Sequence, residues 1–213
     1  MTGKSRGRPR TYDPDRALQR SLEAFWLGGF AGTSLDSLAA ATSMNRPSLY
    51  AAFGDKKALY LKALTRFSDE LREKLGASLS VRMPIAEALA ALYQTAIDLY
   101  QSGVDGPRGC FIVCTAPVEA ALDEDIRAAL HLILSEMDEG LEARFEEAAA
   151  LGELPPQAEP AGLARLAAAT LHSLAIRARA GEPRRALDAM ADHAVRLLCG
   201  AKRPRRRANA IRH

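Results

Sequence analysis

Three short helices are predicted in the first sixty residues, because apolar residues recur at helical spacing between strong start and stop signals. The first helix is expected to begin at Asp13-Pro14 and to end at Gly28-Gly29. An Asp accepts hydrogen bonds from the free amides of a first turn, and Pro needs no N–H partner there. The apolar face of this helix carries Leu18, Leu22, Phe25 and Trp26. Such a beginning favours a domain of short, closely packed helices.

The next two segments predict a pair of very short helices joined by a tight turn. Thr33 is expected to cap the second helix by accepting from the amide of Asp36, and Asn45 is expected to cap the third. Pro47 suits the first turn of that third helix, and the turn before it spans residues 42–44. Two short helices across a tight turn, with another helix packed over them, are typical of a helix-turn-helix. The second helix of that motif enters the major groove of DNA.

Longer helices are predicted for the rest of the chain, at 56–75, 84–102, 110–120, 123–151, 161–180 and 184–199. Ala and Leu are abundant whereas Val and Ile are scarce, and small or straight side chains lose little rotamer freedom in a helix. We therefore expect an all-α fold of about nine helices. We divide the chain into a basic arm at 1–10, a helix-turn-helix domain at 11–55, a larger helical domain at 56–200 and a basic tail at 201–213.

The net charge of +3 hides a strong segregation of charge along the chain. Residues 1–62 hold ten Lys and Arg against five Asp and Glu, and residues 201–213 hold six against none. Residues 63–200 hold 13 against 21, so basic ends flank an acidic body. This distribution indicates either a polyanionic partner for one part of the molecule or a pair of solvated charged tails.

Composition disfavours exported and membrane proteins. We expect neither a secretory signal nor a membrane span, since the first residues are basic and no stretch of about 20 apolar residues is uninterrupted. The three cysteines are an odd number in a chain without an export signal, so they are expected to be reduced thiols. These features predict a cytoplasmic protein.

The polar residues around the third short helix suit the recognition of DNA. Arg46 can pair bidentately with guanine, and Asn45 or Ser48 can bond bases or the backbone. Tyr50 can donate its hydroxyl to a phosphate. Each of these residues alone would suit a cap or an exposed position, but together at one helix start they favour an interface with DNA.

Helix starts and the basic ends offer further contacts with DNA. Phosphates bind well at helix starts, where the chain places Thr33 or Ser34 and, later, Lys56. Residues 4–10 are broken by Gly and Pro, so they suit either an arm in an A·T-rich minor groove or a solubilising tail. The basic side chains of this arm include Arg6, Arg8 and Arg10. The tail at 201–213 either adds nonspecific attraction for phosphate or is a solvated charged tail, and its distance in sequence from the third helix favours the solvated tail.

The segment GFAGTSLDSLAAATSMNRPSLYAAFGDKKALYLKAL, residues 29–64, resembles the DNA-binding domain of the tetracycline-repressor (TetR) family. A glycine-aromatic pair, Thr-Ser, Leu-Tyr-x-x-Phe, a turn, a Lys and Leu-Tyr follow one another in register. The resemblance implies an all-α homodimer that usually represses transcription. Its three-helix domain binds double-stranded DNA at a palindromic operator, and its larger domain binds a small-molecule inducer and dimerises through the last two helices.

Carried over by position, the resemblance assigns roles to individual residues. It matches the family's DNA-facing helix to Arg46, Pro47, Ser48 and Tyr50. Lys56 matches the phosphate-binding lysine. Ser43 departs from the pattern, because the turn of the motif usually has glycine. A positive φ at Ser43 would therefore strain the backbone.

The cysteines of the larger domain allow three interpretations. Residues 107–130 resemble the central segment of a TetR subgroup, and they place Cys110 and Cys114 on one helix face. These residues are small core side chains, thiols that sense electrophiles or oxidants as in some relatives, or part of a soft-metal site. No histidine is tied to them by spacing, so no metal is expected. Arg108 is the nearby charge expected to lower the pKa of Cys110.

An inducer pocket and a subunit interface are expected in the larger domain. The pocket should lie among the helices between residues 84 and 180. Its candidate lining residues are Leu92, Tyr93, Ile97, Cys110, Phe111, Cys114, Met137 and Leu171. The last two helices alternate small and large apolar residues, which suits either an interface with a second subunit or an intramolecular core.

Two other functions compete with a regulator. A thiol-dependent enzyme would need a base beside Cys110, but no histidine adjoins it in sequence and no phosphate-binding glycine loop is present. A nonspecific architectural protein would suit the basic ends, yet it does not need an acidic body. We therefore expect a DNA-binding transcriptional regulator that is not an enzyme and carries no cofactor.

Overall fold

The computed structural model describes residues 13–79, 83–103 and 106–200, and every regular element within these ranges is a helix. The elements are α1 (Pro14–Gly32), α2 (Leu35–Thr42), α3 (Arg46–Phe53), α4 (Lys56–Gly76), the 3₁₀ turn η1 (Ala77–Leu79), α5 (Ile85–Gln101), α6 (Phe111–Ala120), α7 (Glu124–Ala150), α8 (Pro160–Arg179) and α9 (Arg184–Leu198). The predicted all-α fold is confirmed. None of the helices in these ranges combines the length and apolar character that a membrane span requires.

The first helix begins at the predicted cap and contains a kink near its end. Asp13 Oδ1 accepts from the amides of Asp15 at 3.0 Å and Arg16 at 3.4 Å. The regular part of α1 ends at Gly29, whose φ of 70° and ψ of 175° are not helical, and a further turn runs to Gly32. The glycine stop signal therefore marks the kink, whereas the element itself ends later.

The cap of α2 differs from the prediction. Ser34, not Thr33, is its N-cap, and the Ser34 side chain accepts from the amide of Ser37 at 3.0 Å. Thr33 is buried, and its hydroxyl donates to the carbonyl of Gly29 at 2.6 Å. Because the helix breaks at Gly29, this carbonyl lacks the amide partner of a regular turn, and the threonine supplies the hydrogen bond instead.

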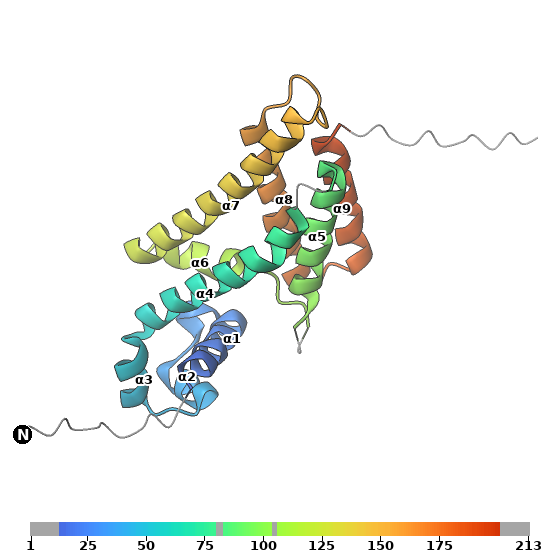
Figure 1. Cartoon of the computed structure of the whole chain (residues 1–213). Coiled ribbons are helices and arrows are strands. Elements are labelled where there is room, and N and C mark those ends of the chain that lie inside the picture. Colours follow the sequence, from blue (N-terminus) through green and yellow to red (C-terminus); the bar gives the residue numbers. More distant parts are fainter. Residues whose placement is uncertain (1–12, 80–82, 104–105, 201–213) are drawn as a thin grey trace, which may run out of the picture.

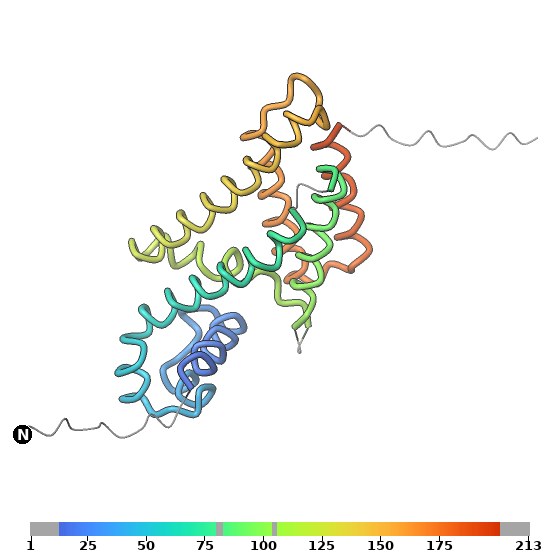
Figure 2. Tube along the Cα trace, viewed as in Figure 1, coloured from blue at the N-terminus to red at the C-terminus, as the bar shows by residue number. Residues whose placement is uncertain are grey.

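Two groups of helices make up the molecule. At one end lie α1, α2 and α3, and α4 leads from them into a body formed by α5 to α9 (Figure 1). The trace in Figure 2 follows the same path and shows α4 running between the two groups. Within the body, α7 packs along α8 and α6, and α9 packs on α5 and α8. Helix α4 therefore belongs to both groups.

Aromatic side chains fill the junction between the small group and the body. Trp26 of α1 lies edge-on to Phe67 of α4 at a centroid distance of 4.7 Å, and 6.0 Å from Phe111 of α6. Tyr60 of α4 lies 5.7 Å from Phe111, and its hydroxyl is 2.7 Å from that of Thr115. Such edge-on pairs add to the stabilisation that burial gives. The small group and the body thus share one hydrophobic core.

Candidate nucleic-acid interface

Helices α2 and α3 form a helix-turn-helix. Leu38 of α2, Met44 of the turn and Leu49 of α3 are all buried beneath the motif. Asn45 is the N-cap of α3, and its Oδ1 accepts from the amide of Ser48 at 2.9 Å. One side of α3 is therefore held against the core, and its polar side faces away from the molecule.

Ser43 forms the turn of the motif in the left-handed conformation, with φ 57° and ψ 31°. Its amide donates to the carbonyl of Ala40 at 3.3 Å, and the amide of Met44 donates to that of Ala39 at 3.1 Å, which closes the end of α2. Among the described residues, Ser43 is the only non-glycine with a positive φ. The departure from glycine therefore falls at a strained position.

Arg20 braces this turn from α1, although nothing in its sequence context distinguishes it. Its Nη1 donates to Ser43 Oγ at 3.2 Å and to the carbonyl of Ala41 at 3.3 Å. A single arginine on the polar side of an amphipathic helix gives no sign of a partner in another helix. The contact depends on how α1 packs across the motif, so it emerges only from the tertiary structure.

The candidate DNA-facing residues of α3 lie on its accessible side. Arg46 keeps 53% of its side-chain surface exposed, and Tyr50 is 46% exposed. Asn45 and Pro47 are exposed, and Ser48 is half-buried because its amide lies under the cap. Residues from the first two turns of α3 therefore present donors and acceptors to the outside.

Arg46 is paired with Asp36 of α2. Its Nε lies 2.8 Å from Asp36 Oδ1, and its Nη2 lies 2.5 Å from Oδ2. The hydrogen bond and positive charge of Arg46 hold the pKa of Asp36 below its ordinary value. The acidic partner carries no sequence signal, because ten residues and a turn separate the two positions.

Lys56 occupies the first position of α4 and lies against an aromatic ring. Its Nζ is 4.4 Å from the centroid of Phe30, and partial burial lowers its pKa. The neighbouring Lys57 instead pairs with Asp123 at 3.2 Å and Asp125 at 2.5 Å, at the start of α7. Lys56 therefore contacts the small group of helices, whereas Lys57 forms ion pairs with the body.

The remaining candidate phosphate contacts are the residues at the start of α2 and the two basic ends of the chain. Ser34 is exposed at the start of α2, where free amides meet the solvent. Thr33 is buried, and its hydroxyl donates to the carbonyl of Gly29 inside the molecule. The basic arm with Arg6, Arg8 and Arg10 lies outside the described residues, as does the tail at 201–213.

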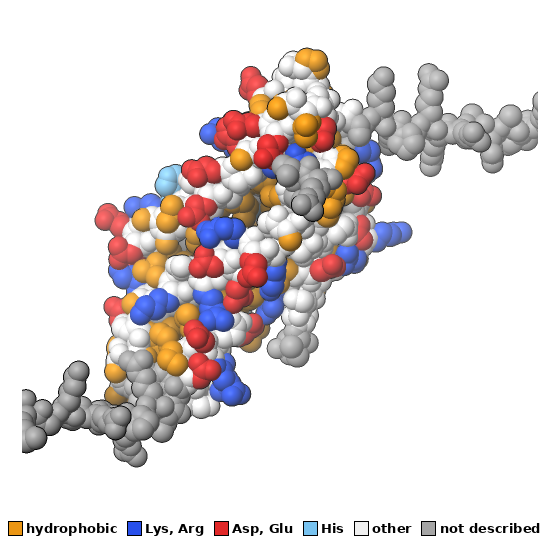
Figure 3. Space-filling model, in the orientation of Figure 1, with side chains coloured by type: hydrophobic (Ala, Val, Ile, Leu, Met, Phe, Trp, Pro, Cys, Tyr) orange, Lys and Arg blue, Asp and Glu red, His pale blue; other side chains and the backbone are white. Residues whose placement is uncertain are grey.

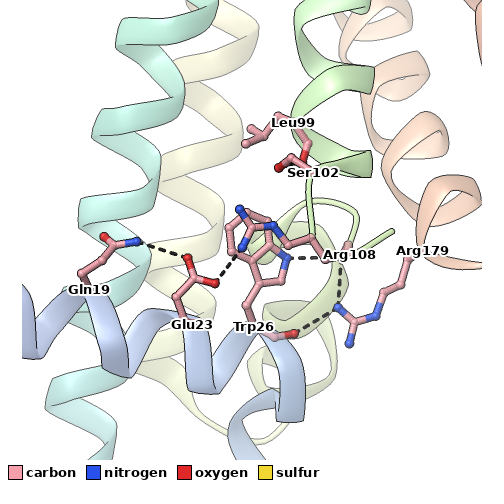
Figure 4. Close-up of polar contacts among 7 residues, drawn as sticks. All are labelled: Gln19, Glu23, Trp26, Leu99, Ser102, Arg108 and Arg179. Atoms are coloured by element: carbon pink, nitrogen blue, oxygen red, sulfur yellow. Dashed lines mark hydrogen bonds and ion pairs between the residues drawn. The ribbon is translucent and has the colours of Figure 1, made fainter. Parts of the chain in front are cut away.

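A polar cluster joins α1 to the body beside the aromatic junction (Figure 4). The guanidinium of Arg108 lies 3.8 Å from the centre of the Trp26 ring, and its Nη1 pairs with Glu23 at 2.7 Å. Trp26 Nε1 donates to the carbonyl of Arg108 at 3.2 Å. Arg179, from the end of α8, donates to the carbonyls of both Trp26 and Arg108 at 3.2 Å. The cluster therefore ties together α1, the loop before α6, and α8.

The cysteines are not activated in the way the sequence suggests. Arg108 turns toward α1, and Cys110 is buried at the start of α6. Burial raises the pKa of the Cys110 thiol to about 12. Burial also raises the pKa of Cys114, although the charge of nearby Arg179 opposes that rise. Both residues are therefore thiols near neutral pH, and a thiol is a far weaker nucleophile than a thiolate.

A cavity of about 300 Å³ lies between α4, η1, α5, α7 and α8. Its lining is mostly aliphatic and includes Leu71, Leu75, Leu79, Leu92, Ile133, Met137, Leu141 and Leu171. Arg72 and Glu136 also line the cavity and pair with each other, so their charges are balanced. Three of the expected residues, Leu92, Met137 and Leu171, are among those that line it.

The other five expected pocket residues do not line this cavity. Tyr93, Ile97 and Phe111 are fully buried in the shared core, and the Tyr93 hydroxyl donates to the carbonyl of Ala167 at 3.2 Å. Cys110 and Cys114 lie at the start of α6, which contributes no residue to the cavity wall. Helical spacing identifies the inward face of a helix, but it does not show which part of that face meets a cavity instead of a neighbouring helix.

The last two helices divide their apolar residues between two surfaces. Many pack inside the protein: Ala164, Ala167, Ala168, Leu171, Leu174, Ala175, Leu187 and Leu198 are buried. Leu166 and Ile176 of α8 and Leu197 of α9 are instead 60%, 55% and 83% exposed. Elsewhere, acidic and basic side chains intermix over the face of the body seen in Figure 3. The buried residues form part of the intramolecular core, whereas Leu166, Ile176 and Leu197 leave large apolar side chains exposed on these helices.

Comparison with known proteins agrees with a helix-turn-helix regulator. The family model described as bacterial regulatory proteins, tetR family, matches residues 17–63. The model described as tetracyclin repressor-like, C-terminal domain, matches residues 86–194. Together these matches cover both the small helical group and most of the body.

Individual relatives extend this similarity over nearly the whole chain. The HTH-type transcriptional repressor ComR of Escherichia coli (strain K12) is 31% identical over 194 residues, which cover 91% of this chain and 92% of ComR. The repressor BdcR of the same strain is 32% identical over 108 residues, or 50% of this chain and 54% of BdcR. A cysteine mutant of the TetR family regulator CifR, solved with 26-bp operator DNA, aligns with a TM-score of 0.81 and 32% identity over 89% of this chain and 98% of CifR.

The fold and the site define a DNA-binding transcriptional regulator built around a helix-turn-helix. The chain belongs to the TetR family of bacterial transcriptional regulators. Membership decides against the thiol-dependent enzyme, since the family consists of regulators.

Proposed function

We propose that this protein represses transcription by binding a palindromic operator as a homodimer, and that a small molecule in the body releases it. The observation that carries the proposal is the exposed polar start of α3, held in place by the Asn45 cap and the Ser43 turn. ComR and BdcR are named as repressors, and the CifR structure holds operator DNA. Two copies of α3 about 34–36 Å apart would match successive major grooves of an inverted repeat.

The second subunit is proposed to cover the outer faces of α8 and α9. Leu166, Ile176 and Leu197 expose large apolar side chains there. Removal of such apolar surface from water by a partner lowers the free energy, which favours association. Dimerisation through these helices would place the two α3 helices on one DNA molecule, as an inverted repeat requires.

The proposed effector is an uncharged, largely apolar small molecule. The cavity wall is aliphatic, and its two charged residues, Arg72 and Glu136, already neutralise each other. A charged ligand would lose its hydration without gaining an unpaired opposite charge. An apolar ligand would gain contact with the Leu, Ile and Met side chains of four helices, and its presence could change how α4 and α7 pack.

Modification of a thiol is the second candidate trigger, and Cys114 is the better placed of the two cysteines. It is only partly buried, and it packs beside Ala175 and Arg179 of α8. An adduct on its sulfur would press on Arg179, which holds the carbonyls of Trp26 and Arg108. Cys110 is fully enclosed, so a reagent must first open the core to reach it.

Selection of fragments from random DNA by the purified full-length protein tests the proposed function. An inverted repeat should be enriched. Tyr50→Phe and Lys56→Ala should each weaken binding by a factor that is roughly the same for every DNA sequence, because both residues contact phosphate. Lys56→Ala should also lower the slope of log K against log salt concentration by about one. Ser78→Ala, in η1, is a matched control distant from α3. Enrichment of no sequence, or unchanged binding by both variants, would contradict the proposal.

Two further proposals concern organisation. We propose a division into a helix-turn-helix domain at 11–55 and a larger helical domain at 56–200, so that the boundary falls at the start of α4, whose buried residues pack in the common core. The cytoplasm is the proposed location, since a bacterial regulator meets its operator there.

A further inference from the structure

We propose that Asp36 is a positioning residue that sets how Arg46 reads a base, so that an acidic side chain of α2 contributes to sequence specificity. The inference rests on the proposed function, because it requires α3 to enter the major groove. It comes from the pair itself: a guanidinium at the first position of α3 is held by a carboxylate in the first turn of α2.

The geometry of the pair leaves the useful side of the guanidinium available. Arginine has two edges that each donate two parallel N–H bonds. Asp36 takes the edge formed by Nε and Nη2, at 2.8 and 2.5 Å. The edge formed by Nη1 and the second hydrogen of Nη2 can still span O6 and N7 of guanine. Asp36 therefore fixes the plane of the Arg46 guanidinium without using the edge that a bidentate contact with guanine needs.

The two helices hold the pair in a constant relation to the protein. Leu38 and Leu49 are buried beneath α2 and α3, and the Ser43 turn sets the angle between these helices. The carboxylate of Asp36 is thus a fixed point against which the flexible side chain of Arg46 is oriented. An arginine oriented before binding loses less rotamer freedom when it meets its base.

The exposure of the pair indicates that its main effect is on recognition. The side chains of Arg46 and Asp36 are 53% and 74% exposed. Ion pairs so accessible to water contribute little to the stability of a fold. Asp36 also offsets the charge of Arg46, which weakens attraction to phosphates of any sequence. Both effects, orientation and charge compensation, favour the specific site over other DNA.

The test compares full-length Asp36→Ala with the unchanged protein in a selection from random DNA, followed by titration of the selected duplex and of a scrambled duplex of the same length and composition. We expect Asp36→Ala to lose preference mainly at one base position in each half-site, with a drop of about tenfold in the ratio of specific to nonspecific affinity. Binding to the scrambled duplex should become tighter, because one negative charge is removed from the interface. Asp36→Asn should behave similarly, because it loses the charge and one of the two acceptor oxygens.

Asp15→Ala is the matched control. Asp15 also lies in the first turn of a helix of the small group, its side chain is 89% exposed, and it pairs with Arg66 at 3.7 Å. It changes the net charge equally without touching Arg46. Asp15→Ala should keep the base preference of the unchanged protein, which separates orientation from a general effect of charge.

Arg46→Ala distinguishes failure of this inference from failure of the proposed function. If Arg46→Ala relaxes one base position and Asp36→Ala relaxes the same one, the inference stands. If Arg46→Ala relaxes it and Asp36→Ala leaves the preference intact, only the role of Asp36 is overturned. If neither variant alters any base position, the proposed reading by α3 fails as well. A uniform loss of affinity in Asp36→Ala, with all preferences kept, would indicate a merely structural role and overturn the inference.

Discussion

The guanidinium of Arg108 lies over the indole of Trp26, 3.8 Å from the ring centroid, and this contact joins the body of the protein to α1. The same two residues also exchange a hydrogen bond, from Trp26 Nε1 to the carbonyl of Arg108. Trp26 is in turn packed on Phe67 of α4. A shift of the loop before α6 would therefore move both α1 and the helix that leads to the cavity.

Replacement of Arg108 should weaken this connection. Arg108→Ala removes the stacking on Trp26 and the pair with Glu23, so we expect the free energy of unfolding to fall by about 1 kcal/mol. Arg108→Lys keeps the charge but loses the planar guanidinium over the ring. Its free energy of unfolding should therefore lie between those of Arg108→Ala and the unchanged protein. Urea denaturation measures the stability, and operator binding with and without N-phenyl-1-naphthylamine, an uncharged apolar probe, measures the coupling. Equal release of DNA in Arg108→Ala and the unchanged protein would exclude a coupling role for this contact.

Local signals explain which parts of the fold the sequence predicts well. Asp13 and Asn45 cap their helices through amides two or three residues away, so their sequence context contains the whole interaction. Thr33 and Ser34 are both good caps, and the choice between them depends on the Gly29 kink, which directs Thr33 inward. Prediction therefore succeeds where a contact is short in sequence and fails where a neighbouring distortion decides between two suitable residues.

The candidate site shows the same division. The type and position of Arg46 and Tyr50 indicate an interface with DNA, but the partners that hold this interface come from other helices. Asp36 meets Arg46 across the turn, and Arg20 reaches the turn from α1. These contacts depend on packing angles between helices, which periodicity along one chain does not define. The boundary of the cavity is unpredictable for the same reason.

Ser43→Gly should stabilise the helix-turn-helix. A left-handed residue with a Cβ is strained, and glycine relieves the strain at the cost of greater freedom in the unfolded chain. Loss of the exposed hydrogen bond from Arg20 to Ser43 Oγ offsets part of the gain. We expect a net rise of about 0.5 kcal/mol in the free energy of unfolding. Ser43→Ala keeps the strain and loses the hydrogen bond, so it should be less stable than the unchanged protein. The reverse order of the two variants in urea denaturation would contradict the backbone argument.

Gly140→Leu should close the cavity while stabilising the protein. A Cβ at Gly140, which lies in α7 and lines the cavity, would meet no atom within 4 Å, so a larger side chain has room there. Glycine inside a helix costs roughly 1 kcal/mol relative to a good helix former. We expect higher stability together with binding of N-phenyl-1-naphthylamine that is about tenfold weaker.

Two comparisons separate the contributions of helix propensity and ligand charge. Gly140→Ala gains helix propensity but leaves most of the cavity open, so it should keep probe binding. The sulfonate 1-anilino-8-naphthalenesulfonate has nearly the same rings but carries a negative charge, and it should bind the unchanged protein more weakly than the neutral probe. Stronger binding of the sulfonate would mean that the balance between Arg72 and Glu136 is broken on ligand entry, and that the effector is an anion.

The buried thiol of Cys110 should make stability fall in alkaline solution. Its pKa is raised from 9.0 to about 12 in the folded protein, because burial disfavours the thiolate. Above pH 9 the unfolded chain ionises at this position while the native state keeps its proton, so the unfolded state is favoured by about 1.4 kcal/mol for each further pH unit, until the folded pKa is reached. Below about pH 8 both states are protonated and the contribution is constant. Urea denaturation of the unchanged protein and Cys110→Ala between pH 8 and 10.5 measures this difference. The buried tyrosines titrate equally in both proteins and cancel, so the two stability curves should diverge only above pH 9; parallel curves across that range would mean that the Cys110 thiol reaches solvent in the native state.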